Sequence, residues 1–436
     1  MLLLNLLKRI IHNDIIRVFS LNAIATLVRM LAGIVSVKVV AAIIGPAGIA
    51  LLGQLNNFSA ILLGVANGGI QNGVTKYVAE HKDNQLQINI LLSNALKITL
   101  VFSTLVAIVL VVFHRQLSNL ILLSADYGYV FLIFGFTIIL YTLNALFVSI
   151  LNGFKEFKKY VVVNISGTIV GLIFSVVLVL CYGLQGALIN AVTYQSIVFF
   201  VTLLVCRKCS WFSWRNFIGV YNKGIVRKYF GYSLMTLTSL AVVPVSQMLL
   251  RGYVISEISI IDAGWWEAMN RISNMYLTVI TTSFSVYYLP RLSEIHDKYE
   301  LKSEILRCYK IIMPMLLCTT IAIYALRHIV IWLLFTPDFY PMESMFIWQL
   351  SGDLFKIASW LLAFLMLAKA RTIAFISSEV IFSLLFVGLG FLFMHWNGTV
   401  GITQAYMTSY ILYLLTMIIL FRDILFAKRD ETTSTY

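Results

Sequence analysis

Charged side chains interrupt the long apolar stretches of this chain, and Arg29 is the one with the least compensation nearby. It has no acidic residue three or four positions away on either side. An ionisable group in such a stretch is costly to bury unless it is paired or hydrated, so it usually faces a wet cavity or the interior of a helix bundle. Arg29 is therefore a candidate for binding an anion.

Two pairs of charges have the spacing of an ion pair on one helix. Glu267 and Arg271 are four residues apart, and Asp353 and Lys356 are three apart. Residues at these spacings share a helix face. Each pair either contacts a ligand or only neutralises itself within the helix packing, and the sequence leaves both interpretations open.

The other basic residues within apolar stretches have simpler explanations. Lys38 stands nine residues after the first arginine of its stretch, which places it on nearly the opposite face of a helix. Its long side chain can carry the ammonium toward the membrane surface. Lys97 and Arg251 lie near the ends of their stretches and can do the same.

Basic residues outnumber acidic ones by six to three within the apolar stretches. A wet cavity with that excess attracts anions and repels cations. Glu379, which has no cation nearby in the sequence, and Asp353 are candidates for coupling to a proton or a sodium ion. The candidate substrate-binding residues are Arg29, Lys38, Arg251, Arg271, Asp353 and Lys356.

The elements that must position these residues are membrane-spanning helices. Of the 436 residues, 60% are hydrophobic and 12% are charged, against about 45–50% and about 25% in a soluble domain. Twelve apolar stretches are long enough to cross a bilayer as helices, and they leave no polar face for the strands of a barrel. We expect an all-α polytopic membrane protein.

The distribution of basic residues predicts the orientation of these spans. The two ends and the even-numbered connections carry 24 lysines and arginines, whereas the odd-numbered connections carry only Arg115 and Arg327. Strongly basic connections stay in the cytoplasm. We therefore expect both termini in the cytoplasm, and we attribute the net charge of +13 to membrane topology rather than to nucleic-acid binding.

The two halves of the chain share the pattern of their polar residues. Arg115 and Asp126 are 11 residues apart in the third connection, and Arg327 and Asp338 are 11 apart in the ninth. Two six-helix lobes related by a parallel repeat around a central cavity are typical of transporters. The expected organisation is a cytoplasmic interfacial segment (1–19), an N-lobe (20–206), a basic cytoplasmic linker (207–229), a C-lobe (230–421) and a cytoplasmic tail (422–436).

Other chemistries are missing from the sequence. It contains no G-x-x-x-x-G-K-[ST] loop for a nucleotide phosphate. The histidines all lie in connections or at the ends of spans, and Cys206 and Cys209 form a C-x-x-C motif without further ligands nearby. We expect no metal and no cofactor, and a transporter rather than an enzyme.

Several short stretches carry a resemblance to a known family. They are Gly45-Pro46-Ala47-Gly48, Asn72 to Val78, Ser283 to Tyr287 with Leu289-Pro290, Trp348 to Leu350 with Gly352, Asp353 and Lys356, Ala368 to Ala370, and Gln404 to Met407. With these stretches the chain resembles the Wzx family of bacterial lipid-linked oligosaccharide flippases, and the matches are collinear from about residue 20 to residue 420.

The resemblance implies the fold of the multidrug/oligosaccharidyl-lipid/polysaccharide exporter superfamily. It implies a substrate, an undecaprenyl-diphosphate-linked repeat unit of the O-antigen or common-antigen type, that crosses the inner membrane to the periplasmic leaflet before polymerisation. The resemblance also implies three partners, which are membrane lipid, the polysaccharide polymerase and the chain-length regulator. The family pattern includes basic residues at Arg29, Lys38 and Arg251, the Asp353 and Lys356 pair, and the acid Glu379.

Two other functions remain as alternatives. A cation-coupled multidrug exporter of the same fold is disfavoured because an interior with excess positive charge repels organic cations. An O-antigen polymerase requires an extended periplasmic loop, which the short outward connections do not provide. Coupling to a proton or sodium ion and flipping driven by downstream consumption both stay open, and the sequence does not name the sugars.

Overall fold

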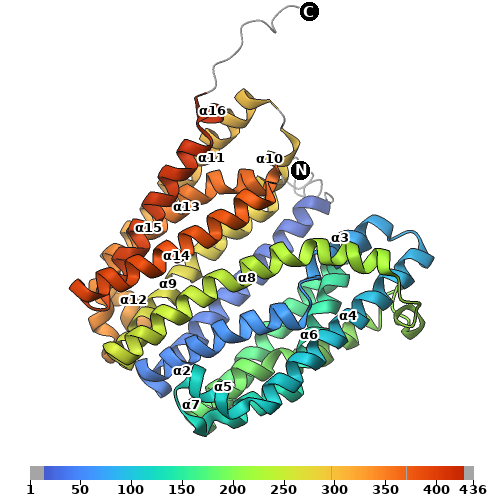
Figure 1. Ribbon diagram of the computed structural model, residues 1–436, viewed down its shortest axis with the longest axis horizontal. Helices are drawn as coiled ribbons and strands as arrows, with labels where there is room; N and C mark the ends of the chain where they lie inside the picture. The colour runs from blue at the N-terminus through green and yellow to red at the C-terminus, as the bar shows by residue number, and fades with distance from the viewer. Residues whose placement is uncertain (1–13, 296, 370, 427–436) are drawn as a thin grey trace, which may run out of the picture. The chain divides into compact units, whose positions relative to one another are not determined.

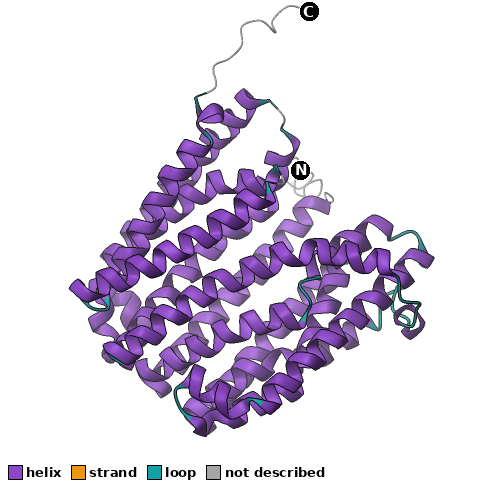
Figure 2. Ribbon diagram, in the orientation of Figure 1, coloured by secondary structure: helices purple, strands orange, loops and turns teal. Residues whose placement is uncertain are grey.

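The computed structural model describes residues 14–295, 297–369 and 371–426, and within them every element is a helix (Figures 1 and 2). The all-α prediction is confirmed for these residues. The predicted interfacial segment 1–19 lies outside the described residues as far as residue 13, and the tail 422–436 does so from residue 427. Two compact units divide the chain, and the boundary falls between Pro244 and Val245.

Unit 1 is built from long helices joined by short turns. Its elements are α2 (Asp14–Ala66), α3 (Gln71–His81), α4 (Gln85–Val112), α5 (His114–Leu122), η1 (Ala125–Tyr127), α6 (Gly128–Gly153), α7 (Phe157–Cys206), η2 (Trp214–Phe217) and the first part of α8 (Lys223–Glu257). Within this unit α7 packs against both α6 and α2.

Unit 2 continues from the second part of α8. Its further elements are α9 (Ile260–Ser283), the π-helical turn η3 (Phe284–Tyr288), α10 (Leu289–Glu294), α11 (Lys298–Ala325), α12 (Arg327–Leu334), η4 (Pro337–Met345), α13 (Phe346–Ala368), α14 (Thr372–Asn397), α15 (Val400–Leu420) and α16 (Arg422–Leu425). Here α15 packs against α13 and α14, and α13 packs against α11.

Nine helices in the described ranges are long and apolar enough to cross a membrane. Two of them, α2 and α7, contain one residue with non-helical backbone angles, Gly45 and Gly183 respectively. Each is thus a pair of helices that meet at a sharp turn, which raises the candidates to eleven. Helix α9 has 24 residues but a more polar composition. With α9 the number would be twelve, and the count of twelve stays a prediction.

The sharp turns share a G-x-x-G pattern. Gly183 has φ 55° and ψ −129°, a conformation that only glycine adopts readily. Three residues later, a Cβ on Gly186 would lie 1.9 Å from the carbonyl oxygen of Leu178, so only a hydrogen fits there. The first glycine reverses the chain, and the second lets the new helix start against the end of the old one.

The same turn recurs 215 residues later, between α14 and α15. Gly398 has φ 57° and ψ −145°, and a Cβ on Gly401 would lie 2.3 Å from the carbonyl oxygen of Phe393. All three positions are displaced by 215 from those in α7. A structural repeat therefore relates the two units, as the polar pattern of the sequence predicts.

A second correspondence supports the repeat. Phe113, between α4 and α5, has φ −99° and ψ 18°, and Leu326, between α11 and α12, has φ −96° and ψ 12°. In both units a long helix is followed at this point by a short helix, a 3-10 turn and another long helix. The third and ninth connections of the sequence are thus equivalent structures.

The segment predicted as a linker, 207–229, is folded onto unit 1. Trp211, Phe217 and Tyr229 are buried in its main hydrophobic cluster. The Trp211 ring stacks on Phe154, with 5.2 Å between centroids and an interplanar angle of 3°. The Lys97 ammonium donates to the carbonyl of Gly219 at 2.5 Å. Burial of these aromatic rings holds the basic segment against the ends of α4 and α6.

Candidate functional site

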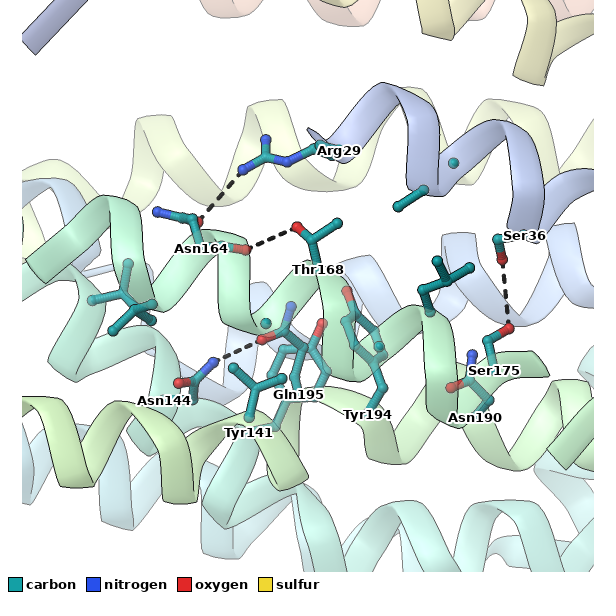
Figure 3. Close-up of a pocket in the computed structure, with 18 of the residues that line it drawn as sticks. Arg29, Ser36, Tyr141, Asn144, Asn164, Thr168, Ser175, Asn190, Tyr194 and Gln195 are labelled. Carbon is teal, nitrogen blue, oxygen red and sulfur yellow. Dashed lines mark hydrogen bonds between the residues drawn. The ribbon is translucent and has the colours of Figure 1, made fainter. Parts of the chain in front are cut away.

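Unit 1 contains a cavity of about 640 Å³ among α2, α6 and both segments of α7 (Figure 3). Its polar lining residues are Arg29, Ser36, Tyr141, Asn144, Asn164, Thr168, Ser175, Asn190, Tyr194 and Gln195. Glycines, alanines and small aliphatic residues complete the lining. The cavity thus offers hydrogen-bonding groups inside helices that are otherwise strongly apolar.

The lining residues recur at helical spacing. On the first segment of α7, Asn164, Thr168 and Ser175 lie on one face, and on the second segment Asn190 and Tyr194 are four residues apart. Apolar residues occupy the other faces of the same helices. The charged residues of the sequence do not reveal this polar face. The available signal was the recurrence of amides and hydroxyls at helical intervals within apolar spans.

Hydrogen bonds fix the amide groups at one end of the cavity. The Asn144 side chain donates to Gln195 at 2.7 Å, and its own oxygen accepts a 2.6 Å bond from Thr202. The Asn164 side chain donates to the carbonyl of Tyr160 at 2.9 Å. These bonds define which atoms of the amides face the cavity.

At the other end of the cavity, the polar groups have fewer hydrogen-bond partners. The hydroxyls of Ser36 and Ser175 are 3.5 Å apart, and the side-chain oxygen of Asn190 has no hydrogen-bond partner within the described structure. The rings of Tyr141 and Tyr194 meet edge to face, with centroids 6.3 Å apart. Figure 3 shows Ser36, Ser175 and Asn190 grouped away from Arg29.

Among the lining residues that the structure describes, Arg29 is the only one with a charged side chain. It is exposed, and the structure gives its guanidinium one long hydrogen bond, 3.5 Å to the side-chain oxygen of Asn164. None of the described lining residues carries a carboxylate. The site therefore has a positive potential, and most of the donors of the guanidinium are available to a ligand.

Lys38, the second candidate on α2, is half-buried and is not among the residues that line the cavity. The structure thus separates it from Arg29, as the nine-residue spacing predicts.

In unit 2 three of the candidate charges form a buried cluster. Arg251 is fully buried and donates to Glu267 at 2.5 Å, and Arg271 donates to the other oxygen of Glu267 at 3.1 Å. The predicted Glu267 and Arg271 pair is confirmed. Arg251 does not extend to the membrane surface as its position near a span end suggests, because Glu267 compensates its charge and the Trp266 ring lies 5.3 Å from its guanidinium carbon.

Asp353 is a fully buried hydrogen-bond acceptor in the same unit. Its carboxylate accepts from the hydroxyl of Ser273 at 2.7 Å, from that of Tyr406 at 2.8 Å, and from that of Tyr276. Three hydroxyl donors from two neighbouring helices thus satisfy this carboxylate within α13.

The predicted ion pair between Asp353 and Lys356 is wrong as a direct contact. Among the described residues no ion pair joins them, and the Lys356 ammonium lies 5.1 to 5.7 Å from three aromatic ring centres. Trp360, Tyr406 and Tyr410 provide these rings. The three-residue spacing could not show that hydroxyl groups, and not Lys356, would donate hydrogen bonds to the Asp353 carboxylate.

Glu379, the candidate for ion coupling on α14, is half-buried in unit 2. No group of three or more histidine, cysteine or acidic side chains in the described ranges could hold a metal ion. Cys206 and Cys209 are buried free thiols. Burial raises the pKa of the Cys209 thiol, although Lys159 partly opposes the shift, so the thiol stays protonated at neutral pH and is a poor metal ligand.

Comparison with known proteins identifies the family. A family model described as "Polysaccharide biosynthesis protein" matches residues 15–296. The chain is 30% identical over 397 residues to the Lipid III flippase of Escherichia coli and to the protein of the same name from Shigella flexneri, with 90% of this chain and 94% of each relative covered. This chain belongs to the polysaccharide biosynthesis protein family.

Solved structures show the fold of this family member. An inward-facing multidrug resistance MATE family transporter of the MOP superfamily matches with a TM-score of 0.72 at 15% identity, covering 92% of this chain and 98% of the transporter. The lipid II flippase MurJ, in an inward closed conformation, matches with a TM-score of 0.70 at 17% identity, covering 92% and 89%. The predicted superfamily fold is thus confirmed.

Proposed function

We propose that this chain moves a lipid-linked oligosaccharide, carried on undecaprenyl diphosphate, from the cytoplasmic to the periplasmic leaflet of a bacterial inner membrane. The observation that carries this proposal is the cavity of unit 1, where one exposed guanidinium stands among neutral amides and hydroxyls. The two relatives named Lipid III flippase support it.

The chemistry of Arg29 suits a diphosphate. A guanidinium presents parallel N–H groups that bind two phosphate oxygens at once, and its charge does not depend on pH in the physiological range. Because no carboxylate occurs among the described lining residues, these residues do not repel an anion. The neutral lining then leaves the rest of the space to uncharged parts of the substrate.

The structural similarity to multidrug transporters does not indicate that this chain exports drugs, because a shared fold does not determine function. A cavity in which the one charged residue of the described lining is an arginine repels organic cations. The polymerase alternative loses support because the sequence relatives are named flippases, which are transporters and not enzymes.

The proposed function extends to the biosynthetic pathway, the membrane orientation and the coupling ion. The repeat unit would belong to O-antigen or common-antigen synthesis, with the polymerase and the chain-length regulator acting downstream. The basic connections support cytoplasmic termini. For coupling to a proton or sodium ion, the candidate carboxylates are Asp353, which is buried on α13, and Glu379, which is half-buried on α14.

The test is deletion of the gene, followed by extraction and identification of the lipid-linked oligosaccharide that accumulates. We expect an undecaprenyl-diphosphate-linked unit to accumulate on the cytoplasmic leaflet while the surface polysaccharide disappears, and a plasmid copy of the gene to reverse both changes. Purified protein in proteoliposomes should then move that lipid between leaflets. Loss of a drug-resistance phenotype with normal surface polysaccharide would contradict the proposal.

A further inference from the structure

The part of the cavity away from Arg29 has features that a diphosphate does not require. Ser36 on α2 and Ser175 and Asn190 on α7 bring hydroxyl and amide groups to this end, and the ring of Tyr194 lies between it and Tyr141, which stands beside Gln195. Amides and hydroxyls can both donate and accept hydrogen bonds. A phosphate oxygen only accepts, so a ligand that uses these groups fully must carry donors as well.

Sugar hydroxyls are such a ligand. Each one donates and accepts, and the apolar face of a sugar ring packs on tyrosine rings such as those of Tyr141 and Tyr194. The side-chain oxygen of Asn190 lacks a partner in the structure, and a buried unsatisfied acceptor is costly until a donor reaches it. A sugar hydroxyl would satisfy this oxygen.

The charge and size of the cavity narrow the class of sugar. Arg29 is the only charged residue of the described lining, so a diphosphate that binds it leaves no cation in that lining for the carboxylate of an acidic sugar. The volume of about 640 Å³ lies within the range of about 300–1,000 Å³ that is usual for small-molecule sites. It suits a few sugar units and excludes the long polyprenyl chain.

We infer that the part of the cavity formed by Ser36, Ser175, Asn190 and Tyr194 binds the neutral sugars next to the diphosphate of the substrate. This inference rests on the proposed function and adds a specificity site to it. The first sugars of the substrate are covalently linked to its diphosphate. When the diphosphate binds Arg29, these sugars are therefore held in the cavity as well, and one molecule can occupy both ends.

Gly33 on α2 keeps this space open. A Cβ at Gly33 would meet no atom within 4 Å, although Gly33 lines the cavity. At Gly167 and Gly171, by contrast, a Cβ would lie 3.0 Å from Val198 and 3.2 Å from Tyr194. A larger side chain at Gly33 therefore fills the cavity without displacing its walls.

The experiment compares Gly33→Leu with a matched control, Gly388→Leu. Gly388 is also a helical glycine whose Cβ would meet nothing within 4 Å, but it lies on the exposed side of α14. The probes are farnesyl diphosphate, its conjugate with a neutral trisaccharide and its conjugate with a trisaccharide containing a uronic acid. Their dissociation constants are measured with the purified full chain by microscale thermophoresis, after thermal unfolding shows that each variant is folded.

We expect the wild type and Gly388→Leu to bind the neutral conjugate at least tenfold more tightly than farnesyl diphosphate, and the acidic conjugate less tightly than the neutral one. Gly33→Leu should lose most of this gain, and its affinity for farnesyl diphosphate should fall by a smaller factor than its affinity for the neutral conjugate. Asn190→Ala should reduce the gain without abolishing it.

Two results would overturn the inference while leaving the proposed function intact. One is a wild type that gains nothing from the sugars. The other is a Gly33→Leu variant that keeps the gain or weakens all probes equally. If the wild type binds none of the probes, both the inference and the proposed function fail.

Discussion

At the scale of single residues, Arg29 is the side chain with the clearest expected effect. Arg29→Ala removes the only charge among the lining residues that the structure describes, and it should lower transport about tenfold or more, since hydrogen bonds to a charged group contribute about 1.5–3 kcal/mol. Arg29→Lys should keep part of the activity, because the charge remains but the two-pronged geometry is lost. Surface polysaccharide in the deletion strain measures both effects.

The control for this experiment is Arg115→Ala, which removes an exposed arginine of α5 in the same unit. Its activity should match the wild type at equal protein level in the membrane. Full activity of Arg29→Ala at that level would show that the diphosphate binds elsewhere.

The hydroxyl groups around Asp353 allow a second test at this scale. Tyr406 donates to the Asp353 carboxylate at 2.8 Å, whereas the nearby Tyr410 contributes its ring to the Lys356 ammonium at 5.6 Å. Tyr406→Phe should destabilise the protein by about 1–3 kcal/mol, because it takes a hydrogen bond from a buried charge, and Tyr410→Phe should have less effect. Thermal unfolding in detergent compares the two, and equal shifts would argue against the hydroxyl network.

The same hydroxyl network determines what we expect when Asp353 and Lys356 are both replaced by neutral residues. Because Asp353 and Lys356 are not in contact, Asp353→Asn with Lys356→Gln cannot restore a broken ion pair. The asparagine would also turn an NH2 group toward hydroxyls that donate to the carboxylate. Each single change should reduce surface polysaccharide, and the double variant should not recover it. Near-normal surface polysaccharide in the double variant would mean that the charges of Asp353 and Lys356 only compensate each other and do not take part in transport.

The charged residue of the site can be predicted from the sequence, whereas helical spacing only suggests its neutral residues and does not show that they line a cavity. A charge without a local partner is rare in an apolar span, so Arg29 is conspicuous. Hydroxyls and amides occur in spans for other reasons, as when Thr193 donates to the carbonyl of Ile189 one turn earlier. Only the packing of α2, α6 and α7 shows which polar face lines a cavity, and that packing is not a local property of the sequence.

At the scale of elements, the G-x-x-G turns make a prediction about stability. Gly401→Ala would place a Cβ 2.3 Å from the backbone of Phe393, and Gly186→Ala would place one 1.9 Å from that of Leu178. Backbone cannot move aside as a side chain can, so each change should destabilise its unit by about 1–3 kcal/mol. Gly388→Ala, where a Cβ would meet nothing within 4 Å, is the control. Thermal unfolding that does not distinguish the three variants would mean that the turns tolerate a wider angle.

The elements themselves follow from the sequence to different degrees. Apolar length predicts α4, α6 and α14 because a helix is the only way to satisfy a backbone in lipid. The repeat is visible in charged residues such as Arg115 and Arg327. The folding of segment 207–229 onto unit 1 is not visible, because its charges suggest a solvated linker while the burial of Trp211 and Phe217 depends on partners more than 50 residues away.

At the scale of the whole molecule, the orientation in the membrane can be tested by thiol labelling. Single cysteines are placed in a cysteine-free chain at exposed positions on the two sides, Ala125 and Asn397 on one, Lys158 and Ser303 on the other. A membrane-impermeant reagent, applied to cells with a permeabilised outer membrane, should label only the first two, because basic connections remain in the cytoplasm. Labelling of Lys158→Cys and Ser303→Cys alone would invert the topology.

The tight turns also bear on how the chain enters the bilayer during synthesis. Between the two glycines of each G-x-x-G turn stand Pro46 and Ala47, Leu184 and Gln185, or Thr399 and Val400, and none of these residues is charged. A helical hairpin with such a tip has almost no polar segment to translocate, so both of its helices can insert together, without the energy cost that a charged loop would add. A lysine introduced at Leu184 or Thr399 should therefore delay or misdirect insertion of its hairpin, even where the finished fold has room for it.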